Sequence, residues 1–371
     1  MTAVGEGHPR WGAVHVNGKC FAQRTTGVQR YARCLLAALD ARLAAKPPRE
    51  PWNLWLPPGA LAPPMRVIQA RSLAWRGPGG LHGWEQVALP RAARDGLLLN
   101  LSGSAPAWAK HQACVMHDAA VFDHPEAYAP LFRHWYQWLF RRLGHRATPP
   151  MTVSAFSRER LSETLGIPAE RLALVPGGAD HLDDVTADHT VLSQHGLLDT
   201  PFLLAVGSAN PTKNLAALVD AWEALARDDA RLVIAGGVHP AVFADAGVRQ
   251  AAGVIRLGPL GDGALKALYG HAAGLVFPSL YEGFGLPPLE AMACGCPVAA
   301  ARAASLPEVC GDAALLFNAA DPQALQAAMR QLLDDAGLCG QLRARGCCRA
   351  KVFTWDRSAA RLLLAIGLAG S

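Results

Sequence analysis

Short apolar runs bounded by Gly, Pro and Asp alternate with amphipathic stretches along almost the whole chain. Runs of this length predict strands that are buried on both faces, as in a parallel sheet. The first half carries the predicted strands 12–16, 52–56, 97–101, 114–117, 151–154 and 172–175. The second half carries the predicted strands 202–206, 231–235, 254–257, 275–277, 297–300 and 314–317.

Helical periodicity fills the spaces between these runs. In residues 214–226, Leu215, Leu218 and Trp222 recur at helical spacing, and residues 322–334 follow Asp321 as a predicted N-cap. Strands that alternate with helices predict parallel sheets covered on both faces, and the two series meet near residues 183–199. We therefore expect two doubly wound α/β domains, residues 1–185 and 186–353, with the polar stretch 183–194 as the linker.

The bulk properties agree with a large folded protein. The chain has 371 residues, of which 51% are hydrophobic and 18% are charged, so two buried cores are expected and disorder is not. Residues 1–12 lack the apolar stretch of a secretion signal, and the apolar run 362–369 is too short to span a bilayer. The nine cysteines show no regular spacing, which favours free thiols in a reducing cytosol.

Charge is unevenly divided along the chain. Residues 1–185 hold 21 Lys and Arg against 14 Asp and Glu, a balance of +7, whereas the remainder holds 14 against 16, a balance of −2. A basic half is compatible with an anionic lipid surface, an acidic substrate or nucleic acid. No run of basic residues resembles a nucleic-acid motif, so no nucleic-acid partner is expected.

The most informative motif is residues 278–293, which follow the predicted strand 275–277. Its core reads Glu-Gly-Phe-Gly-Leu-Pro-Pro from Glu282, and Glu290 stands eight residues after Glu282. The glycines allow close backbone approach, and the prolines open a helix whose N-terminus suits phosphate oxygens. We expect Glu282 before the phosphate loop and Glu290 in the first turn of the helix. A capping carboxylate beside a glycine turn would explain parts of this string but not the whole.

This string resembles glycosyltransferase family 4, and the resemblance covers nearly the entire chain. It implies the GT-B fold, in which two Rossmann-like domains face each other across a cleft. It also implies that Glu282 contacts the transferred sugar and that Glu290 holds the ribose hydroxyls of a nucleotide. The phosphates would lie on the backbone amides of Gly283, Phe284, Gly285 and Leu286.

The loop 207–215 resembles a second family motif, Gly-x4-Arg-Lys-Asn. Lys213 is placed to neutralise the donor phosphate as the leaving group gains charge, whereas Thr212 replaces a common arginine and Ser208 an occasional one. We therefore expect Ser208 and Lys213 at the donor, with Lys213 as a catalytic residue. A solvated lysine is the alternative, but the helix dipole disfavours a cation at a helix N-terminus.

The first half of the chain also contains segments that resemble motifs of the family. Residues 24–31 resemble the family's glycine loop, which places Gly27 at the donor and Arg30 at the acceptor; Thr26 replaces one of two frequent glycines and could equally cap a helix. His117 ends a predicted strand where the family often has a histidine beside the donor sugar, and is expected to be catalytic. Asp118 is assigned to an acceptor hydroxyl, with capping of a turn as the alternative.

Three further stretches match the family in the same way. Residues 152–157 and 175–180 match its late N-domain, with Gly177 in place of the usual asparagine. Residues 353–356 and the apolar helix after them resemble a C-terminal tail, 354–371, that packs back onto the first domain.

The resemblance implies transfer with retention of anomeric configuration from a nucleotide diphosphate sugar. The leaving phosphate would take the acceptor proton on the front face, and no metal or other cofactor is expected because cations and helix ends would replace it. The base and sugar are not specified, although relatives in bacterial polysaccharide synthesis favour GDP-mannose. A non-catalytic nucleotide-sugar-binding subunit and a nucleotide-sugar epimerase are the alternatives.

The acceptor is expected to be a glycan or a lipid-linked glycan. Residues 132–142 mix aromatic residues with Arg133, Arg141 and Arg142, a pattern that suits an anionic membrane surface. A helix half-buried in the first domain with its arginines outward explains the same pattern. We expect a cytoplasmic protein, with peripheral binding to the inner face of the membrane left open.

Overall fold

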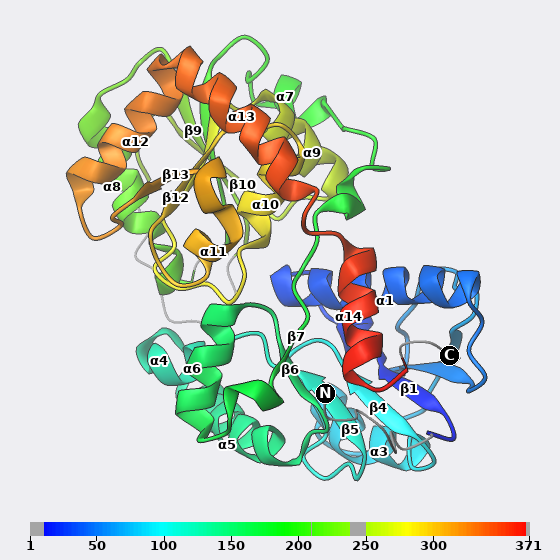
Figure 1. Cartoon of the computed structure of the whole chain (residues 1–371). Helices are drawn as coiled ribbons and strands as arrows, with labels where there is room; N and C mark the ends of the chain where they lie inside the picture. Colours follow the sequence, from blue (N-terminus) through cyan, green and yellow to red (C-terminus); the bar gives the residue numbers. More distant parts are fainter. Residues whose placement is uncertain (1–10, 209, 238–249, 369–371) are drawn as a thin grey trace, which may run out of the picture.

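The computed structural model describes residues 11–208, 210–237 and 250–368, which form two lobes (Figure 1). The N-terminal lobe contains a parallel sheet of seven strands in the order β3-β2-β1-β4-β5-β6-β7. These strands are β1 Val14–Asn17, β2 Trp52–Leu56, β3 Gln69–Ser72, β4 Leu97–Asn100, β5 Gln112–Val115, β6 Pro150–Thr152 and β7 Ala173–Leu174.

The C-terminal lobe repeats the architecture with six parallel strands in the order β10-β9-β8-β11-β12-β13. These strands are β8 Phe202–Val206, β9 Arg231–Ala235, β10 Val254–Gly258, β11 Gly274–Phe277, β12 Val298–Ala301 and β13 Leu315–Phe317. The direction of strand succession reverses between β1 and β4 in one lobe and between β8 and β11 in the other. Loops at such switch points are where doubly wound sheets bind ligands.

Helices surround both sheets. In the N-terminal lobe they are α1 Gly27–Ala45, α2 Gly80–Gly83, α3 Leu89–Ala92, α4 Ala120–Asp123, α5 Pro130–Arg146 and α6 Ala155–Leu165. The rest of the chain adds α7 Thr190–Gln194, α8 Leu215–Leu225, α9 Asp262–His271, α10 Leu286–Ala293, α11 Leu306–Cys310, α12 Pro322–Asp334, α13 Ala336–Ala350 and α14 Trp355–Ala365. Short helical turns include η1 Gly18–Ala22, the π-helical η2 Trp84–Ala88, η5 Asp180–Leu182 and η6 Pro211–Lys213.

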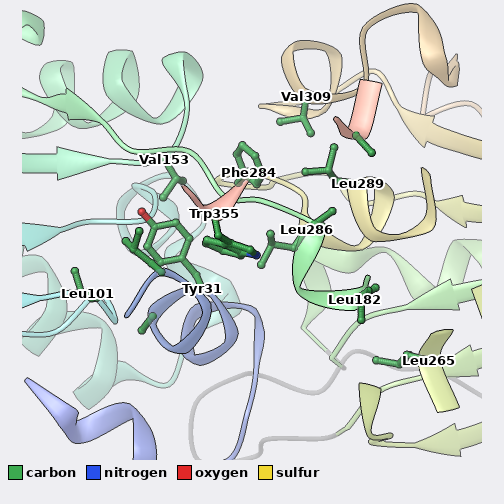
Figure 2. Packing of buried hydrophobic residues seen from close by; sticks show 14 of the residues in the cluster. Tyr31, Leu101, Val153, Leu182, Leu265, Phe284, Leu286, Leu289, Val309 and Trp355 are labelled. Atoms are coloured by element: carbon green, nitrogen blue, oxygen red, sulfur yellow. The ribbon is translucent and has the colours of Figure 1, made fainter. Parts of the chain in front are cut away.

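The last helix leaves the C-terminal lobe and lies beside α1 of the N-terminal lobe (Figure 1). Its indole Trp355 is buried against Tyr31 of α1, with ring centroids 5.5 Å apart. Phe284 and Leu286 of the C-terminal lobe belong to the same hydrophobic cluster (Figure 2). One apolar core therefore runs continuously through the junction between the lobes.

The sequence predicted the central strands and two helices closely, with three departures. Strand β3 was missed because all four of its residues are exposed and carry no apolar run. The predicted linker 183–194 is wrong in its second half, where α7 forms and buries Val191 and Leu192. Glu290 is the fifth residue of α10, just beyond the first turn in which it was expected.

Three other predictions concern features outside the sheets. Asp321 caps α12 as predicted, because its side chain accepts from the amides of Gln323 and Ala324. All nine cysteines are free thiols. Within the described ranges, no helix combines the length and the apolar character needed to cross a bilayer. The predicted domain boundaries stay predictions, although the two sheets lie on either side of residues 185 and 186.

Candidate functional site

The two switch-point loops of the C-terminal lobe bring Lys213 and Glu282 together. Lys213 follows β8 in η6, Glu282 follows β11, and the Lys213 ammonium forms an ion pair with the Glu282 carboxylate. The backbone joins the same loops, because the Leu280 amide donates to the Thr212 carbonyl at 2.7 Å. Both side chains are largely buried, so the pair lies in a medium where charge interactions are stronger than in water.

The position of Lys213 is set locally. Asn210 caps η6 by accepting from the Thr212 amide at 3.0 Å, and Asn214 turns the chain into α8 with a left-handed φ of 56°. A cation at this helix N-terminus is opposed by the helix dipole, and the Glu282 carboxylate offsets that cost. Ser208 is half-buried in the same loop, and Ala209 lies outside the described residues.

Serine hydroxyls fix the carbonyls of the glycine loop. Ser305 donates to the carbonyls of Glu282 and Phe284, each at 2.9 Å. Ser154 and Ser157, at the start of α6 in the other lobe, donate to the Gly283 carbonyl at 2.6 and 3.0 Å.

Among the residues that the structure describes, the backbone amides of residues 283–286 find no acceptor. The loop leads directly into α10, with Gly285 at φ 100° as its N-cap. Four free amides at a helix N-terminus form a site for an anion.

Gly283 also explains why the loop contains glycine. A Cβ atom on Gly283 would lie 2.5 Å from the His117 carbonyl oxygen and 3.1 Å from the Asp118 Cβ. The glycine loop of one lobe therefore packs against the segment after β5 of the other. The sequence predicted a close approach of backbone to ligand, and the structure shows a close approach of backbone to backbone at the same residue.

His117 and Asp118 lie just beyond β5, which ends two residues earlier than the predicted strand. His117 Nε2 donates to the Leu101 carbonyl at 3.0 Å, which leaves Nδ1 as an acceptor. Burial lowers the pKa of His117 to about 4, so its imidazole is neutral near pH 7.

Burial, together with the negative charge of Glu282, raises the pKa of Asp118 above the ordinary carboxyl value. Asp118 also accepts from the Ala120 amide at 2.9 Å, as the capping alternative predicted.

The other motif glutamate, Glu290, lies deep between the lobes. Tyr269 donates its hydroxyl to Glu290 Oε2 at 3.0 Å, while His181 Nε2 and Arg30 Nε lie 3.3 and 3.5 Å from Oε1. Arg30, assigned to the acceptor from the sequence, thus lies against the glutamate assigned to ribose. His181 and Tyr269 were missed because no motif marks them; only the fold brings them to Glu290.

The glycine loop of the N-terminal lobe, residues 24–31, contains the N-terminus of α1. Thr26 is the N-cap of α1 and forms a capping box with Gln29, the alternative that the sequence left open. Gly27, the first residue of α1, is exposed and has open space where a Cβ would stand. Its donor role stays a prediction.

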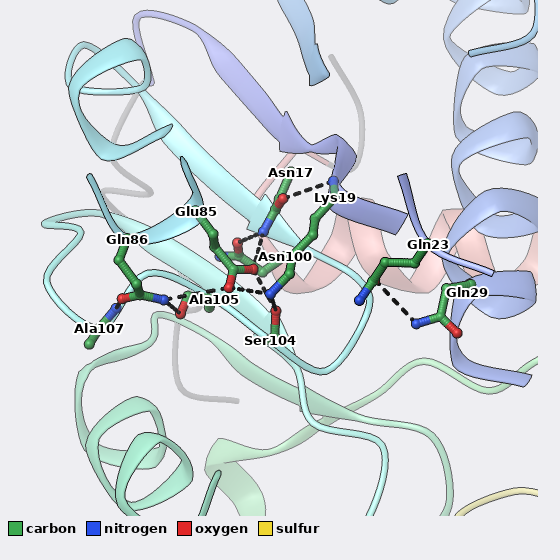
Figure 3. Close-up of polar contacts among 10 residues, drawn as sticks. All are labelled: Asn17, Lys19, Gln23, Gln29, Glu85, Gln86, Asn100, Ser104, Ala105 and Ala107. Carbon is green, nitrogen blue, oxygen red and sulfur yellow. Dashed lines mark hydrogen bonds and ion pairs between the residues drawn. The ribbon is translucent and has the colours of Figure 1, made fainter. Parts of the chain in front are cut away.

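A buried polar network supports the neighbouring loop after β4. Lys19 contacts Glu85 at 2.6 Å and Ser104 at 3.1 Å, while Asn17 joins Glu85 to Asn100 (Figure 3). Both charges are almost fully buried and satisfied by several partners, as buried ions require. The network holds the loop whose Leu101 carbonyl orients His117.

The chemistry of the site is that of an anion-binding loop with a carboxylate and an ammonium beside it. Within the described part of the chain, no group of three or more His, Cys, Asp or Glu side chains is arranged to hold a metal ion. The expectation that no metal is needed stays a prediction.

Comparisons with known proteins agree with this arrangement. The family model of the group 1 glycosyl transferases matches residues 200–335, which contain both switch-point loops and α10. The chain is 35% identical over 254 residues to the O-antigen chain mannosyltransferase B of Escherichia coli, an alignment that covers 65% of this chain and 66% of that protein. It is 31% identical over 261 residues to the serotype-specific mannosyltransferase WbdA of Escherichia coli, covering 66% of this chain and 32% of that one. The chain thus spans 66% and 32% of the lengths of these two relatives.

The whole architecture is shared with a solved structure. Sucrose-phosphate synthase from Thermosynechococcus elongatus superposes with a TM-score of 0.74 at 20% identity, covering 97% of this chain and all of that one. The superposition confirms the predicted GT-B fold of two Rossmann-like lobes. The matching family model and the relatives together place this chain in the group 1, family 4-like glycosyltransferases.

Proposed function

We propose that this chain is a retaining glycosyltransferase that moves a hexose from a nucleotide diphosphate sugar to a hydroxyl of a glycan or lipid-linked glycan. The observation that carries the proposal is the Lys213–Glu282 ion pair beside the unpaired amides of residues 283–286. Gly283, in the same loop, packs against the His117 carbonyl across the junction of the lobes. An anion site, a cation and a sugar-facing carboxylate are the parts that the transfer needs.

In the proposed reaction the diphosphate lies on the amides at the start of α10 and on Lys213. The bond from the anomeric carbon to the β-phosphate oxygen breaks, and both electrons go to the phosphate, whose charge Lys213 and the amides stabilise. The acceptor oxygen forms the new bond on the same face and gives its proton to that phosphate oxygen. Glu282 stabilises the positive sugar ring, and neutral His117 accepts a hydrogen bond from a sugar hydroxyl through Nδ1.

Mannose from GDP-mannose is the favoured donor. The support is the function named for the two relatives above, an O-antigen chain mannosyltransferase and a serotype-specific mannosyltransferase. We propose that no metal takes part, because Lys213 and the helix N-terminus already supply positive potential at the diphosphate.

Thermal-shift measurements with GDP, UDP and dTDP test this function first, and turnover of the matching sugar nucleotide tests it second. We expect GDP to raise Tm most and GDP-mannose to be consumed only when a glycan acceptor is present. Binding without turnover would favour a non-catalytic nucleotide-sugar-binding subunit. Conversion of the free sugar nucleotide without an acceptor would favour an epimerase.

We also propose that the face of α5 meets an anionic membrane. Leu139, Phe140 and Leu143 are buried, so α5 is a packed helix, but Leu131 is 85% and Trp138 is 42% exposed. Trp108, which is 68% exposed, lies beside Trp138 with ring centroids 6.4 Å apart. Exposed indoles beside arginines suit the interface between lipid headgroups and acyl chains.

A further inference from the structure

Arg30 reaches from the N-terminal lobe to two carboxylates of the C-terminal lobe. It lies in the first turn of α1, and its Nη2 lies 2.6 Å from Asp262 Oδ1 at the start of α9. Its Nε lies 3.5 Å from Glu290 Oε1 in α10. The Arg30 side chain is only 13% exposed, whereas Asp262 is 45% exposed, so the guanidinium reaches inward to Glu290 from the edge of the junction.

Glu290 is prepared to bind something that the protein itself does not supply. The residue is 3% exposed, and its Oε2 accepts from Tyr269. Among the described residues, Oε1 has no hydrogen-bond donor, because the contacts to His181 and Arg30 lack hydrogen-bond geometry. A buried carboxylate oxygen without a donor is costly unless a ligand satisfies it. A ribose hydroxyl would do so.

The positive environment of Glu290 comes from outside its own lobe. Trp355 Nε1 donates to His181 Nδ1 at 3.1 Å, and Arg30 Nη1 lies 3.1 Å from His181 Nε2, so the imidazole is held beside Glu290 by the last helix and by α1. Burial disfavours the charged carboxylate, but the adjacent His181 and the charge of Arg30 outweigh it, so the pKa of Glu290 is lowered. Arg30 belongs to α1, and His181 to the segment that joins the lobes. If the lobes separate, Glu290 loses the guanidinium.

We propose that Arg30 is a positioning residue that keeps Glu290 charged and oriented for the donor ribose only when the lobes are together. Asp262 anchors the guanidinium, so that Arg30 lies beside Oε1 of Glu290 without donating a hydrogen bond to it. The N-terminal lobe thereby controls the affinity of the C-terminal lobe for nucleotide. This role rests on the proposed function, because it assumes that a nucleotide ribose binds at Glu290.

The experiment measures GDP affinity by calorimetry in the whole protein, with UDP or dTDP instead if the thermal-shift screen selects one of them. Arg30→Gln should weaken binding by roughly tenfold or more, because it leaves a buried carboxylate without its counter-charge. Arg30→Lys should recover part of the loss, because it restores the charge. Arg42→Gln is the matched control: Arg42 also lies on α1 and pairs with Asp356 at 2.6 Å, but on the surface. It should bind GDP as the wild type does.

A double-mutant cycle with Glu290→Gln separates an indirect effect from a general one. If Arg30 acts through Glu290, Arg30→Gln should cause no further loss in the Glu290→Gln background. Wild-type affinity in Arg30→Gln, or losses that simply add, would overturn the proposed role of Arg30 and leave the donor site standing. An unchanged GDP affinity in Glu290→Gln alone would show that the donor nucleotide does not bind at Glu290.

Discussion

At the scale of single residues, the site is organised around charges that satisfy one another before any substrate binds. Lys213 and Glu282 pair in the same way that Arg30 pairs with Asp262. A site built from such pairs is preorganised, because its side chains are already held in place by partners. In the proposed reaction, a diphosphate takes up part of the charge of Lys213, which would release Glu282 toward the sugar.

Glu282→Gln should lower kcat by about two orders of magnitude or more, the usual loss for removing one contact to a transition-state charge. Nucleotide affinity should change little, because Glu282 is expected to contact the sugar and not the nucleotide. Steady-state kinetics and calorimetry on the same preparation separate the two effects. Glu163→Gln, a surface change in α6, is the control. Near-normal turnover in Glu282→Gln would place this residue outside the active site.

Lys213→Ala should weaken the nucleoside diphosphate far more than the free nucleoside, because the ammonium is expected on the phosphates. Glu290→Gln should weaken both ligands, because it acts on the ribose. Calorimetry with GDP and guanosine distinguishes these patterns, and Lys351→Ala, an exposed lysine after α13, provides the control. Equal losses for both ligands in Lys213→Ala would argue against a phosphate contact.

At the scale of elements, α5 shows how one helix serves two environments. Its buried side packs on the N-terminal sheet, while its exposed edge carries Leu131, Trp138 and several arginines. The arginines are not equivalent: Arg142 lies 3.5 Å from the Trp108 ring centroid and donates to the Ala107 carbonyl, so it also supports the fold. Arg141 and Arg146 are exposed and are better probes of a surface.

If this edge meets a membrane, the protein should sediment with anionic vesicles of phosphatidylserine and phosphatidylcholine and detach as salt rises. Each arginine near the surface contributes about 1 kcal/mol, and the attraction decays over a Debye length. Arg141→Gln with Arg146→Gln should release the protein without changing GDP binding. Arg345→Gln with Arg361→Gln removes the same charge elsewhere and should not. If wild type stays in solution at low salt, the membrane proposal is wrong.

At the scale of the whole molecule, the two lobes are joined by polar contacts around the site as well as by the shared core. Glu308 of α11 accepts from the amides of Ala155 and Phe156 at 2.9 and 3.2 Å, so it caps α6 of the other lobe. Tyr281 donates to Asp123 at 2.8 Å across the same junction. These contacts stabilise the lobes in the arrangement that brings Gly283 against His117.

Glu308 can cap α6 only when the lobes are together, and such a cap contributes about 1 kcal/mol to that arrangement. Glu308→Ala removes this contribution and should therefore favour separated lobes. Small-angle X-ray scattering of the nucleotide-free protein should show a larger radius of gyration, and nucleotide affinity should fall as well, because Arg30 leaves Glu290 when the lobes separate. Glu159→Ala, an exposed glutamate within α6, is the control. An unchanged scattering profile would show that this cap does not hold the lobes together.

The sequence by itself determined the elements and the identity of the loops. Apolar runs, helical periodicity and the Gly-Pro string at residues 283–288 are local signals, because burial and backbone freedom act within a few residues. They predicted strands β2, β8 and β9 at their observed bounds, together with α12 and its cap. The short, exposed β3 carries no such signal, because its pairing with β2 supplies its stability.

Only the tertiary structure decided which distant side chains meet. Arg30 and Glu290 are 260 positions apart, and their contact depends on how two lobes pack, which no local pattern encodes. The same packing explains Gly177, where a Cβ would lie 2.9 Å from both Phe284 and Leu286. Electrostatic interactions depend on the distance between charges in space, and that distance is set by the fold and not by the separation of the residues along the chain. Motifs therefore identified the candidate site residues Lys213, Glu282 and Glu290, whereas the fold alone revealed the residues that hold them in place.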